Sequence, residues 1–416
     1  MKKAIKYLSG MKSRCFMLLT CLILLVGATS CSSDDFEINL PDDPKQLSKS
    51  ELLQKYSKAE LIEQALSRMP KTRATNSCLR MITIKDSITI RYSATEDMKI
   101  HVNNKTIIPM KKGNNITYSY GFPDDDLSHV VEIRGSQLAI QSLNIDDNGL
   151  IWFEIYSNEN LVILSCVNNH LDELNLTKFP KLHTLYITNN EFSNIDITCL
   201  PQLQVLRADN NQLTAVSVSE NLNLRTLNLE RNNITNIDLS KNTNLTGFSL
   251  SHNPITNLDL SKNINLSIIF LENVPIQTIN DVIISDTIFS FFPKLSYLNI
   301  AYTSFDALNL SCNPLITWID ISGTAITQLD ISNLQIRLLN ATRSKLTNLI
   351  YEKKDLNNLY ELRIESTPFE KVWDNINSLS SNLPERSETN PGHLYTYSKY
   401  IYLLEINRND HWLINQ

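Results

Sequence analysis

The feature that most constrains this chain is an internal repeat of 21 residues. Segments 224–244 and 245–265 carry apolar residues at the same offsets from their first leucine (0, 3, 5, 10, 13 and 15), and an asparagine at offset 8. The pattern has eleven starts, and the first six steps between them are all 21 residues. The starts are Ile140, Leu161, Leu182, Leu203, Leu224, Leu245, Leu266, Leu295, Ile316, Ile336 and Leu359. A period of this length predicts a solenoid in which each repeat forms one coil.

Offsets 0 to 6 predict one short strand in each coil. Strand side chains alternate between the two faces of a sheet, so offsets 3 and 5 share the buried face. Offsets 2, 4 and 6 then share the solvent face, with offset 7 just beyond the strand. The second apolar group, at offsets 10 to 15, returns to the same core from the other side. One repeat cannot bury these residues alone, whereas stacked repeats form a continuous core.

Asparagine recurs at offset 8, where each strand is expected to turn away from the sheet. The first six repeats carry Asn148, Asn169, Asn190, Asn211, Asn232 and Asn253. An amide side chain both donates and accepts hydrogen bonds, so a stack of them can satisfy backbone groups that the turn leaves unpaired. The later repeats carry Val274, Thr303, Thr324, Ser344 and Thr367. A hydroxyl replaces part of that bonding and Val274 replaces none, so we expect a weaker ladder after Leu266.

The consensus LxxLxLxxNxIxxIDLSxN resembles the leucine-rich repeat family over roughly residues 140–374. The 21-residue spacing and the LDLS motif resemble those in the repeat lipoproteins of gut Bacteroidetes, which are also similar to listerial internalins. The resemblance implies an α/β solenoid dominated by β structure: a right-handed leucine-rich repeat solenoid with one parallel strand per coil and about eleven repeats in residues 136–373. The family shares a binding scaffold and no single ligand, so the resemblance says much more about fold than about function.

Residues 1–30 have the layout of a secretory signal. Lys and Arg end at Arg14, an apolar run covers 16–26, and small residues precede Cys31. The apolar run is too short to span a bilayer as a helix. The sequence ATSC at 28–31 resembles a bacterial lipobox, although it lacks the commonest Leu. It predicts lipidation of Cys31, and the alternative is a plain signal peptide with an incidental cysteine.

Residues 31–76 combine a tether with a helix. The SSDD that follows Cys31 resembles the acidic tag of surface-exported Bacteroidetes lipoproteins, which implies an outer membrane lipoprotein exposed at the cell surface. Residues 34–45 are acidic and contain proline, as a flexible tether does. A capping box at 48–51 and the apolar residues that follow at helical spacing predict one amphipathic helix ending at Pro70. Packing on a neighbour and action as a spacer are both open for this helix.

Two flanking elements are expected to cover the ends of the repeats. Alternating apolar residues and turn clusters in 77–135 predict a small antiparallel β domain. We expect its last run, 129–135, to cap the first coil, because a solenoid end needs its apolar face covered. Residues 374–416 predict a C-terminal cap, with a helix at 374–383 and strand and helix fragments in 391–414. Both flanks resemble those of the Bacteroidetes lipoproteins.

The composition and motifs argue against several classes of function. The net charge of −6 is spread over interspersed charges, so there is no basic stripe for nucleic acid. The 7 His are scattered without metal-ligand spacing, and GxSxG and phosphate-loop motifs are absent. We therefore expect no enzyme, metal, cofactor or nucleic acid partner. No spacing suggests disulfide pairs, so free thiols are expected for Cys78, Cys166, Cys199 and Cys312.

The candidate binding site lies on the solvent face of the strands. Offset 4 is mostly polar, as in a solvated sheet, and three consecutive coils break that rule. Because neighbouring strands lie about 4.8 Å apart, their side chains can form one patch. The patch consists of Ile268, Phe270, Tyr297, Tyr302 and Trp318. The Leu266 repeat is eight residues too long, and we expect the excess, in 282–293, to rise beside the patch. Burial of the patch beneath the phenylalanines of that segment is the competing interpretation.

Two functions are compatible with such a patch. The first is a surface-anchored module whose concave face binds a host or bacterial protein, since Trp and Tyr anchors amid polar residues suit protein interfaces. The alternative is carbohydrate binding, with the same rings stacked on sugars of a host or dietary glycan. A broad open sheet around Trp318 favours protein, and a narrow polar cleft favours glycan. We expect a monomer that contacts the membrane only through its N-terminal lipid.

Overall fold

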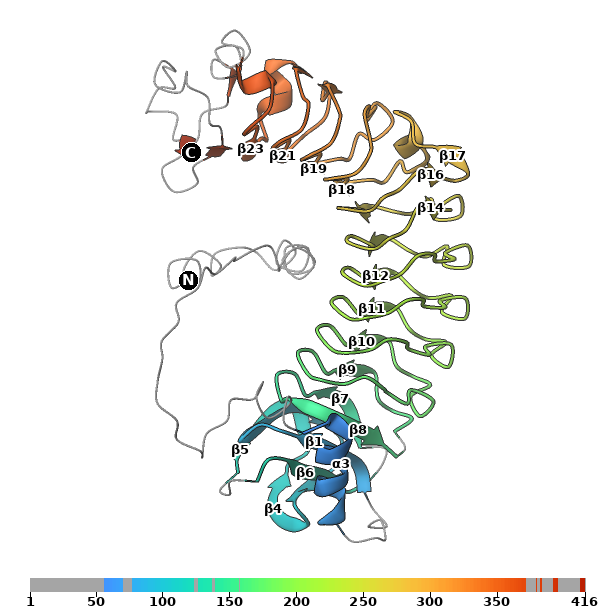
Figure 1. Ribbon diagram of the computed structural model, residues 1–416, viewed down its shortest axis with the longest axis vertical. Coiled ribbons are helices and arrows are strands. Elements are labelled where there is room, and N and C mark those ends of the chain that lie inside the picture. Colours follow the sequence, from blue (N-terminus) through green and yellow to red (C-terminus); the bar gives the residue numbers. More distant parts are fainter. Residues whose placement is uncertain are drawn as a thin grey trace. The chain divides into compact units, whose positions relative to one another are not determined.

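A computed structural model describes most of the chain. It covers residues 56–69, 77–122, 126–136, 139–156 and 158–371, and near the C-terminus 379, 382–383, 392–395 and 412–415. All of these residues belong to one compact unit, residues 52–416. Within this unit the coils stack along an arc, and their strands line its inner, concave side (Figure 1). The predicted signal peptide, Cys31 and the tether lie outside the described residues.

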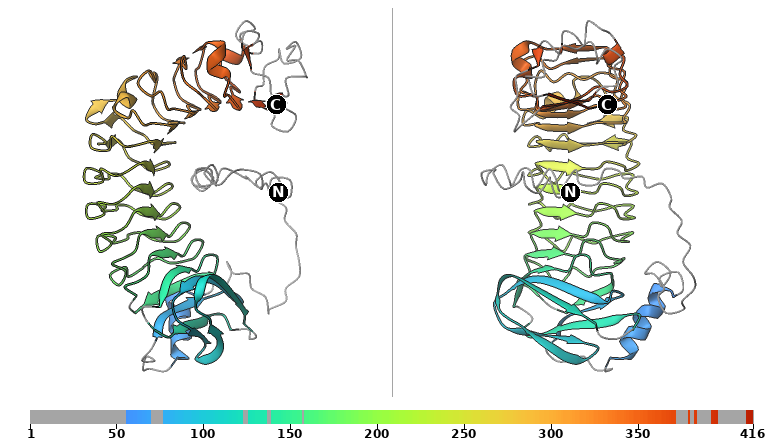
Figure 2. Two further views of the ribbon diagram at one scale, coloured as in Figure 1. Left: turned by 180° about the vertical axis from the view of Figure 1, so that it is seen from behind. Right: turned by 90° about the vertical axis from the view of Figure 1, so that its left-hand side faces the viewer.

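One sheet of 15 strands runs through the unit. Its repeat strands are β7 (Ile140–Asn144), β9 (Ile163–Ser165), β10 (Thr184–Tyr186), β11 (Val205–Arg207), β12 (Thr226–Asn228), β13 (Gly247–Ser249), β15 (Ile268–Phe270), β18 (Tyr297–Asn299), β19 (Trp318–Asp320), β21 (Leu338–Asn340) and β23 (Glu361–Arg363). They are parallel and pair without register shifts, so residues at equal offsets lie side by side in columns (Figure 2). The expected leucine-rich repeat solenoid, with one parallel strand per coil, is confirmed.

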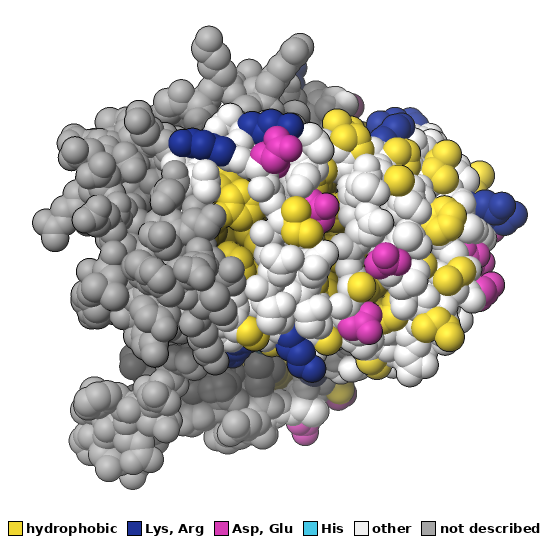
Figure 3. Space-filling model, turned by 90° about the horizontal axis from the view of Figure 1, so that it is seen from above, with side chains coloured by type: hydrophobic (Ala, Val, Ile, Leu, Met, Phe, Trp, Pro, Cys, Tyr) yellow, Lys and Arg dark blue, Asp and Glu magenta, His cyan; other side chains and the backbone are white. Residues whose placement is uncertain are grey.

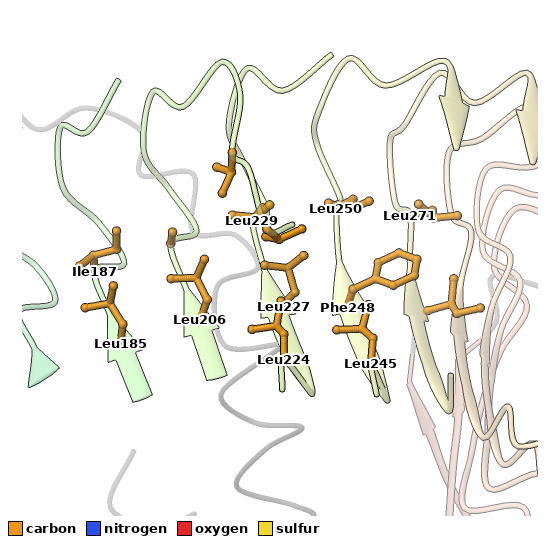
Figure 4. Packing of buried hydrophobic residues seen from close by; sticks show 14 of the residues in the cluster. Leu185, Ile187, Leu206, Leu224, Leu227, Leu229, Leu245, Phe248, Leu250 and Leu271 are labelled. Atoms are coloured by element: carbon orange, nitrogen blue, oxygen red, sulfur yellow. The ribbon is translucent and has the colours of Figure 1, made fainter. Parts of the chain in front are cut away.

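The core is built from the predicted offsets. Leu227 at offset 3 and Leu229 at offset 5 are both 0% exposed. Figure 4 shows Leu227 in line with Leu206 and Phe248 of the neighbouring coils. Burying one such side chain stabilises a fold by about 1.5 to 3 kcal/mol, so these columns are the main source of stability.

The offset-8 asparagines join adjacent coils. The Nδ2 of Asn232 donates to the carbonyl oxygen of Ala208 in the preceding coil (2.9 Å) and to that of Leu229 in its own coil (3.0 Å). Its Oδ1 accepts from the backbone N–H of Leu213 in the preceding coil (2.9 Å). Each asparagine of this kind therefore satisfies backbone groups of two coils at once.

The hydrogen bonds made by the side chain at offset 8 change after Leu266. Thr303, Thr324 and Thr367 each donate through the hydroxyl to the carbonyl oxygen three residues back, within their own coil. These bonds do not join one coil to the next. The prediction of a weaker ladder in the later repeats is confirmed.

Seven elements form or border the N-terminal part: α3 (Lys58–Ser67), β1 (Ser77–Thr83), β2 (Ser87–Ala94), β3 (Met98–Val102), β4 (Lys105–Met110), β5 (Gly113–Gly121) and β6 (His129–Arg134). With β8 (Leu150–Ile155), four of these strands make a second sheet in the order β4-β3-β6-β1-β8. Helix α3 buries Leu61 and Ala65 in a small cluster with Ile82 and Val130. The helix therefore packs on a neighbour. It begins at Lys58 behind a capping box of Ser57 and Glu60, while the box expected at 48–51 lies outside the described residues.

The strand that covers the first coil is β2, and the expectation for segment 129–135 was wrong. β2 pairs antiparallel with β7, and β5 pairs with β2, so both extend the long sheet. β6 instead lies between β3 and β1 in the second sheet. Both strands carry regular apolar residues, and such a pattern does not specify which neighbour a strand will pair with.

The C-terminal strands continue the repeat sheet. β24 (Gly392–Tyr395) pairs in parallel with β23, and β25 (Trp412–Asn415) pairs in parallel with β24. These are the strand fragments expected in 391–414. Most of the helix expected at 374–383 lies outside the described residues.

Short elements cover the side of the coils opposite the long sheet (Figure 1). They are β14 (Asn257–Leu258), β16 (Thr278–Ile279), β17 (Val282–Ile283), β20 (Gln328–Asp330), β22 (Asn348–Ile350) and the 3-10 helices η2 (Ile288–Phe291), η3 (Lys353–Leu356) and η4 (Phe369–Lys371). The column at offset 13 runs along this side, and Val372, its last member, lies outside the described residues. Across the described ranges, no helix has both the length and the apolar character needed to cross a membrane.

Candidate functional site

Strand pairing brings most of the predicted patch together. Ile268, Tyr297 and Trp318 are the first residues of β15, β18 and β19, and they are direct cross-strand neighbours. All three are partly exposed on the concave face. They form a continuous apolar column at offset 2.

Phe270 differs from the expectation of an exposed ring, because it is only 3% exposed. Its ring centroid lies 5.6 Å from that of Trp318, with the two planes tilted by 46°. Such a pair is worth about 0.5 to 1.5 kcal/mol beyond the area that it buries. Phe270 therefore packs against Trp318 and is too little exposed to be a contact surface itself.

Tyr302 lies at offset 7, where the backbone of every coil enters the left-handed region. Its φ is +54°, a conformation that suits Asn or Gly and is costly for a large side chain. The ring is nevertheless 47% exposed. It lies over Gly323 of the next coil, where a Cβ would come within 2.4 Å of its Cδ1 atom. Because all coils share this conformation at offset 7, it belongs to the repeat, and Tyr302 stands out by its exposed aromatic ring.

The apolar column extends one coil beyond the predicted patch, because Leu338 follows directly after Trp318. Ile163 and Val205 lie at offset 2 in earlier coils, where Thr226 and Gly247 separate them from Ile268. Ile163 is 42% exposed, and the other two are partly exposed. These residues were overlooked because polarity was assessed at offset 4. The same scan at offset 2 would have found them.

The extra segment of the Leu266 repeat lies away from the patch, on the opposite side of the coils (Figure 1). β17 pairs with β16 there, outside the long sheet. Phe289 and Phe292 are 0% exposed, and Phe289 packs against Phe305 with the ring centroids 5.5 Å apart. The expectation that this segment rises beside the patch was wrong, as was the competing interpretation that it covers the patch. Phe289 and Phe292 enter the main core, whereas Phe291 stays exposed.

On the face seen from above, apolar side chains are scattered (Figure 3). Figure 3, a view from above, shows them singly or in small groups among polar and charged side chains. Isolated apolar residues on a surface are ordinary. Alignment in one column distinguishes the concave face.

Carboxylates follow the apolar column along the same face. In the earlier coils, Glu230 lies 3.3 Å from Arg231 Nε, and Asp209 accepts from Thr188 Oγ1 at 2.7 Å. In the patch itself, the carboxylates are Glu272 at offset 6 and Asp320 at offset 4. Burial raises the pKa of Glu230 and that of Asp320 above the ordinary carboxyl values. The face is therefore apolar along one side and acidic along the other.

The remaining reactive groups do not suggest catalysis. Cys166, Cys199 and Cys312 are free, and burial raises the pKa of the Cys166 thiol far above its ordinary value. Within the described ranges, no three His, Cys, Asp or Glu side chains gather as metal ligands do. The side chain of Cys78 lies outside what the structure describes.

Comparison with solved structures identifies the fold. The functional domain of InlJ from Listeria monocytogenes, which includes a cysteine ladder, is similar with a TM-score of 0.52 and 23% identity. The match covers 68% of this chain and 64% of that domain, so the chain spans less than two thirds of the listerial domain. No protein-family model and no curated protein matches the sequence.

Two further solved structures are similar at lower scores. A leucine-rich repeat protein of Leptospira interrogans has a TM-score of 0.49 and 19% identity, over 62% of this chain and 73% of that one. An internalin, InlF, from Listeria monocytogenes has 0.47 and 17%, over 66% and 87%. The chain has the leucine-rich repeat fold of the listerial InlJ domain.

Proposed function

We propose that this protein is a lipid-anchored surface protein that binds a protein ligand on its concave face. The observation that carries the proposal is the apolar column of Ile268, Tyr297 and Trp318, with the exposed ring of Tyr302 at offset 7 of the middle coil. Large apolar side chains aligned on a rigid sheet are exposed to water without adding to the core. Such a surface is stabilised when a partner covers it.

The shape of the face supports a protein ligand over a glycan. The sheet continues in register from β15 through β21, so Trp318 lies on a broad, open surface with strands on both sides. Open, aromatic surfaces of this kind suit protein partners, whose anchor residues need a flat surround that excludes water. Leucine-rich repeat domains are in general interaction scaffolds rather than enzymes, which agrees with a binding role.

Replacement of Trp318 tests this function. We expect Trp318→Ala to lower ligand affinity by about 2 to 4 kcal/mol, because it removes the central anchor. The unfolding free energy should fall by only about 1 kcal/mol, since the ring is partly exposed and packs against the ring of Phe270. The measurement is capture of extracellular host proteins and of mucus glycans by the immobilised full chain, with a thermal melt of each variant.

The matched control is Phe291→Ala, which removes a 53% exposed aromatic ring on the opposite side of the coils. This variant should capture the same proteins as the unaltered chain. Equal capture by Trp318→Ala would contradict the proposed site. A fall of roughly 3 to 5 kcal/mol in its stability would mean instead that Trp318 is a core residue. Capture of glycans alone would support the carbohydrate alternative.

Replacement of Cys31 tests the anchor. We expect Cys31→Ser to yield a product that no longer partitions with membranes, because the only attachment proposed is the lipid on that cysteine. Detergent-phase partitioning of the two full chains is the measurement. A Ser variant that still enters the detergent phase would show that the ATSC sequence is not a lipidation site.

A further inference from the structure

On the concave face, the apolar anchors and the carboxylates of the patch are close neighbours. Trp318 and Asp320 are the first and third residues of β19, so their side chains lie on the same side of the strand. Residues two apart along a strand are separated by about 6.6 Å. A ligand group that covers Trp318 therefore lies within one side-chain length of the Asp320 carboxylate.

Both carboxylates of the patch are bonded to neutral groups. Asp320 accepts from the backbone N–H of Ser322 at 2.9 Å and from Asn340 Nδ2 at 2.7 Å. Glu272 accepts from Asn299 Nδ2 at 3.1 Å and lies 3.6 Å from His252 Nε2.

The imidazole does not supply a positive charge near neutral pH. Burial lowers the pKa of His252 below 6.5, and the neighbouring Glu272 only partly offsets that effect. Within the described part of the chain, no Lys or Arg forms an ion pair with Glu272 or Asp320. The patch thus carries negative charge that no Lys or Arg of the described residues neutralises.

The earlier coils of the same face differ. There Arg231 lies 3.3 Å from Glu230, and Arg207 lies 3.8 Å from Asp209. These carboxylates have cationic neighbours on their own coil. Glu272 and Asp320 therefore differ from Glu230 and Asp209, each of which has an arginine beside it.

The two patch carboxylates also affect one another. Burial raises the pKa of Asp320, and the negative charge of Glu272 raises it further. A partly desolvated site with two like charges favours a cation strongly, because the attraction is screened less than in water.

We propose that the ligand is a polypeptide segment that places an apolar side chain on Tyr297 and Trp318 and a Lys or Arg side chain between Glu272 and Asp320. The proposal rests on the function proposed above and specifies the partner. An extended segment with apolar and basic residues two positions apart matches the spacing of the face. Acidic glycans and acidic proteins are repelled by the same carboxylates.

Three synthetic peptides test the charge preference. Each repeats Leu-Ser-X-Ser, in which X is Lys, Gln or Glu, so that Leu and X are two positions apart and face the same side of an extended peptide. Binding to the immobilised full chain is measured at low and high salt. We expect the Lys peptide to bind about ten-fold more tightly than the Gln peptide, and the Glu peptide to bind most weakly. The advantage of the Lys peptide should shrink as salt rises, since screening weakens exposed charge pairs.

Variants with neutral side chains test which carboxylates cause the preference for the Lys peptide. The double variant Glu272→Gln, Asp320→Asn should bind the Lys and Gln peptides about equally while it keeps its affinity for the Gln peptide. The control, Glu220→Gln with Asp306→Asn, removes the same charge from exposed positions outside the strands and should keep the preference. Equal binding of the Lys and Gln peptides by the unaltered chain, or an unchanged preference in the first variant, overturns the inference about charge. Peptide binding that Trp318→Ala does not reduce overturns the proposed function instead.

Discussion

Leu227→Asp is expected to abolish cooperative unfolding of the repeat domain. Leu227 is 0% exposed and stacks between Leu206 and Phe248 of the adjacent coils. The substitution removes a buried leucine, at about 2 to 5 kcal/mol, and introduces a carboxyl group without a partner. The sum approaches the total stability of an ordinary domain, which is about 5 to 15 kcal/mol. Circular dichroism during heating, with limited proteolysis, is the measurement.

The neighbouring residue provides the control. Thr226 precedes Leu227 on the same strand and faces the solvent side of the sheet, partly exposed. Thr226→Asp should therefore retain a cooperative melt close to that of the unaltered chain. A shift of the strand by one residue exchanges the two faces, so the pair of variants tests the register directly. A normal melt for Leu227→Asp would show that the register is wrong.

Asn232→Ala is expected to destabilise the repeats by roughly 3 to 5 kcal/mol. The change leaves the Ala208 carbonyl oxygen and the Leu213 N–H without the side-chain partners that they have at 2.9 Å. Each buried group that loses its partner costs about 1 to 3 kcal/mol, and the bond to Leu229 is lost as well. Denaturant unfolding followed by circular dichroism gives the difference.

Thr324→Ala is the matched variant at the same offset in a later coil. Its hydroxyl donates to Ile321 within one coil at 2.6 Å, so its loss should cost only about 1 kcal/mol. Similar losses for the two variants would mean that the asparagines do not hold adjacent coils together. The two variants together distinguish the effect of hydrogen bonds between coils from that of a hydrogen bond within one coil.

The periodic part of the molecule could be predicted because each position is specified many times. Leu227 and its equivalents follow one offset through eleven repeats, so strand positions, core columns and the change in the ladder were all correct. The covering strand could not be predicted in the same way. β2 and β6 occur once each, and an alternating pattern does not determine which strand will be the neighbour.

The candidate site was predictable only in part. Equal offsets brought Ile268, Tyr297 and Trp318 together, as columns of a solenoid must. The burial of Phe270 depends on how the Trp318 ring leans, and that is a rotamer choice between coils which spacing does not specify. The direction of the extra segment depends on Phe289 and Phe292, whose apolar character fits either side of a coil. Insertions break the period on which the rest of the prediction depends.

Because the asparagine ladder ends before the patch, ligand binding should also stiffen this part of the solenoid. The coils that begin at Leu266, Leu295 and Ile316 carry the patch, and at offset 8 they have Val274, Thr303 and Thr324 instead of asparagine. The patch thus lies wholly on coils without that amide clamp, next to a clamped block that ends with Asn253. Local opening takes less free energy where fewer bonds must break. Asn313 still joins the Leu295 coil to the coil before it, and a partner that spans the three coils adds further links, so its affinity and the stiffness of this part of the solenoid rise together.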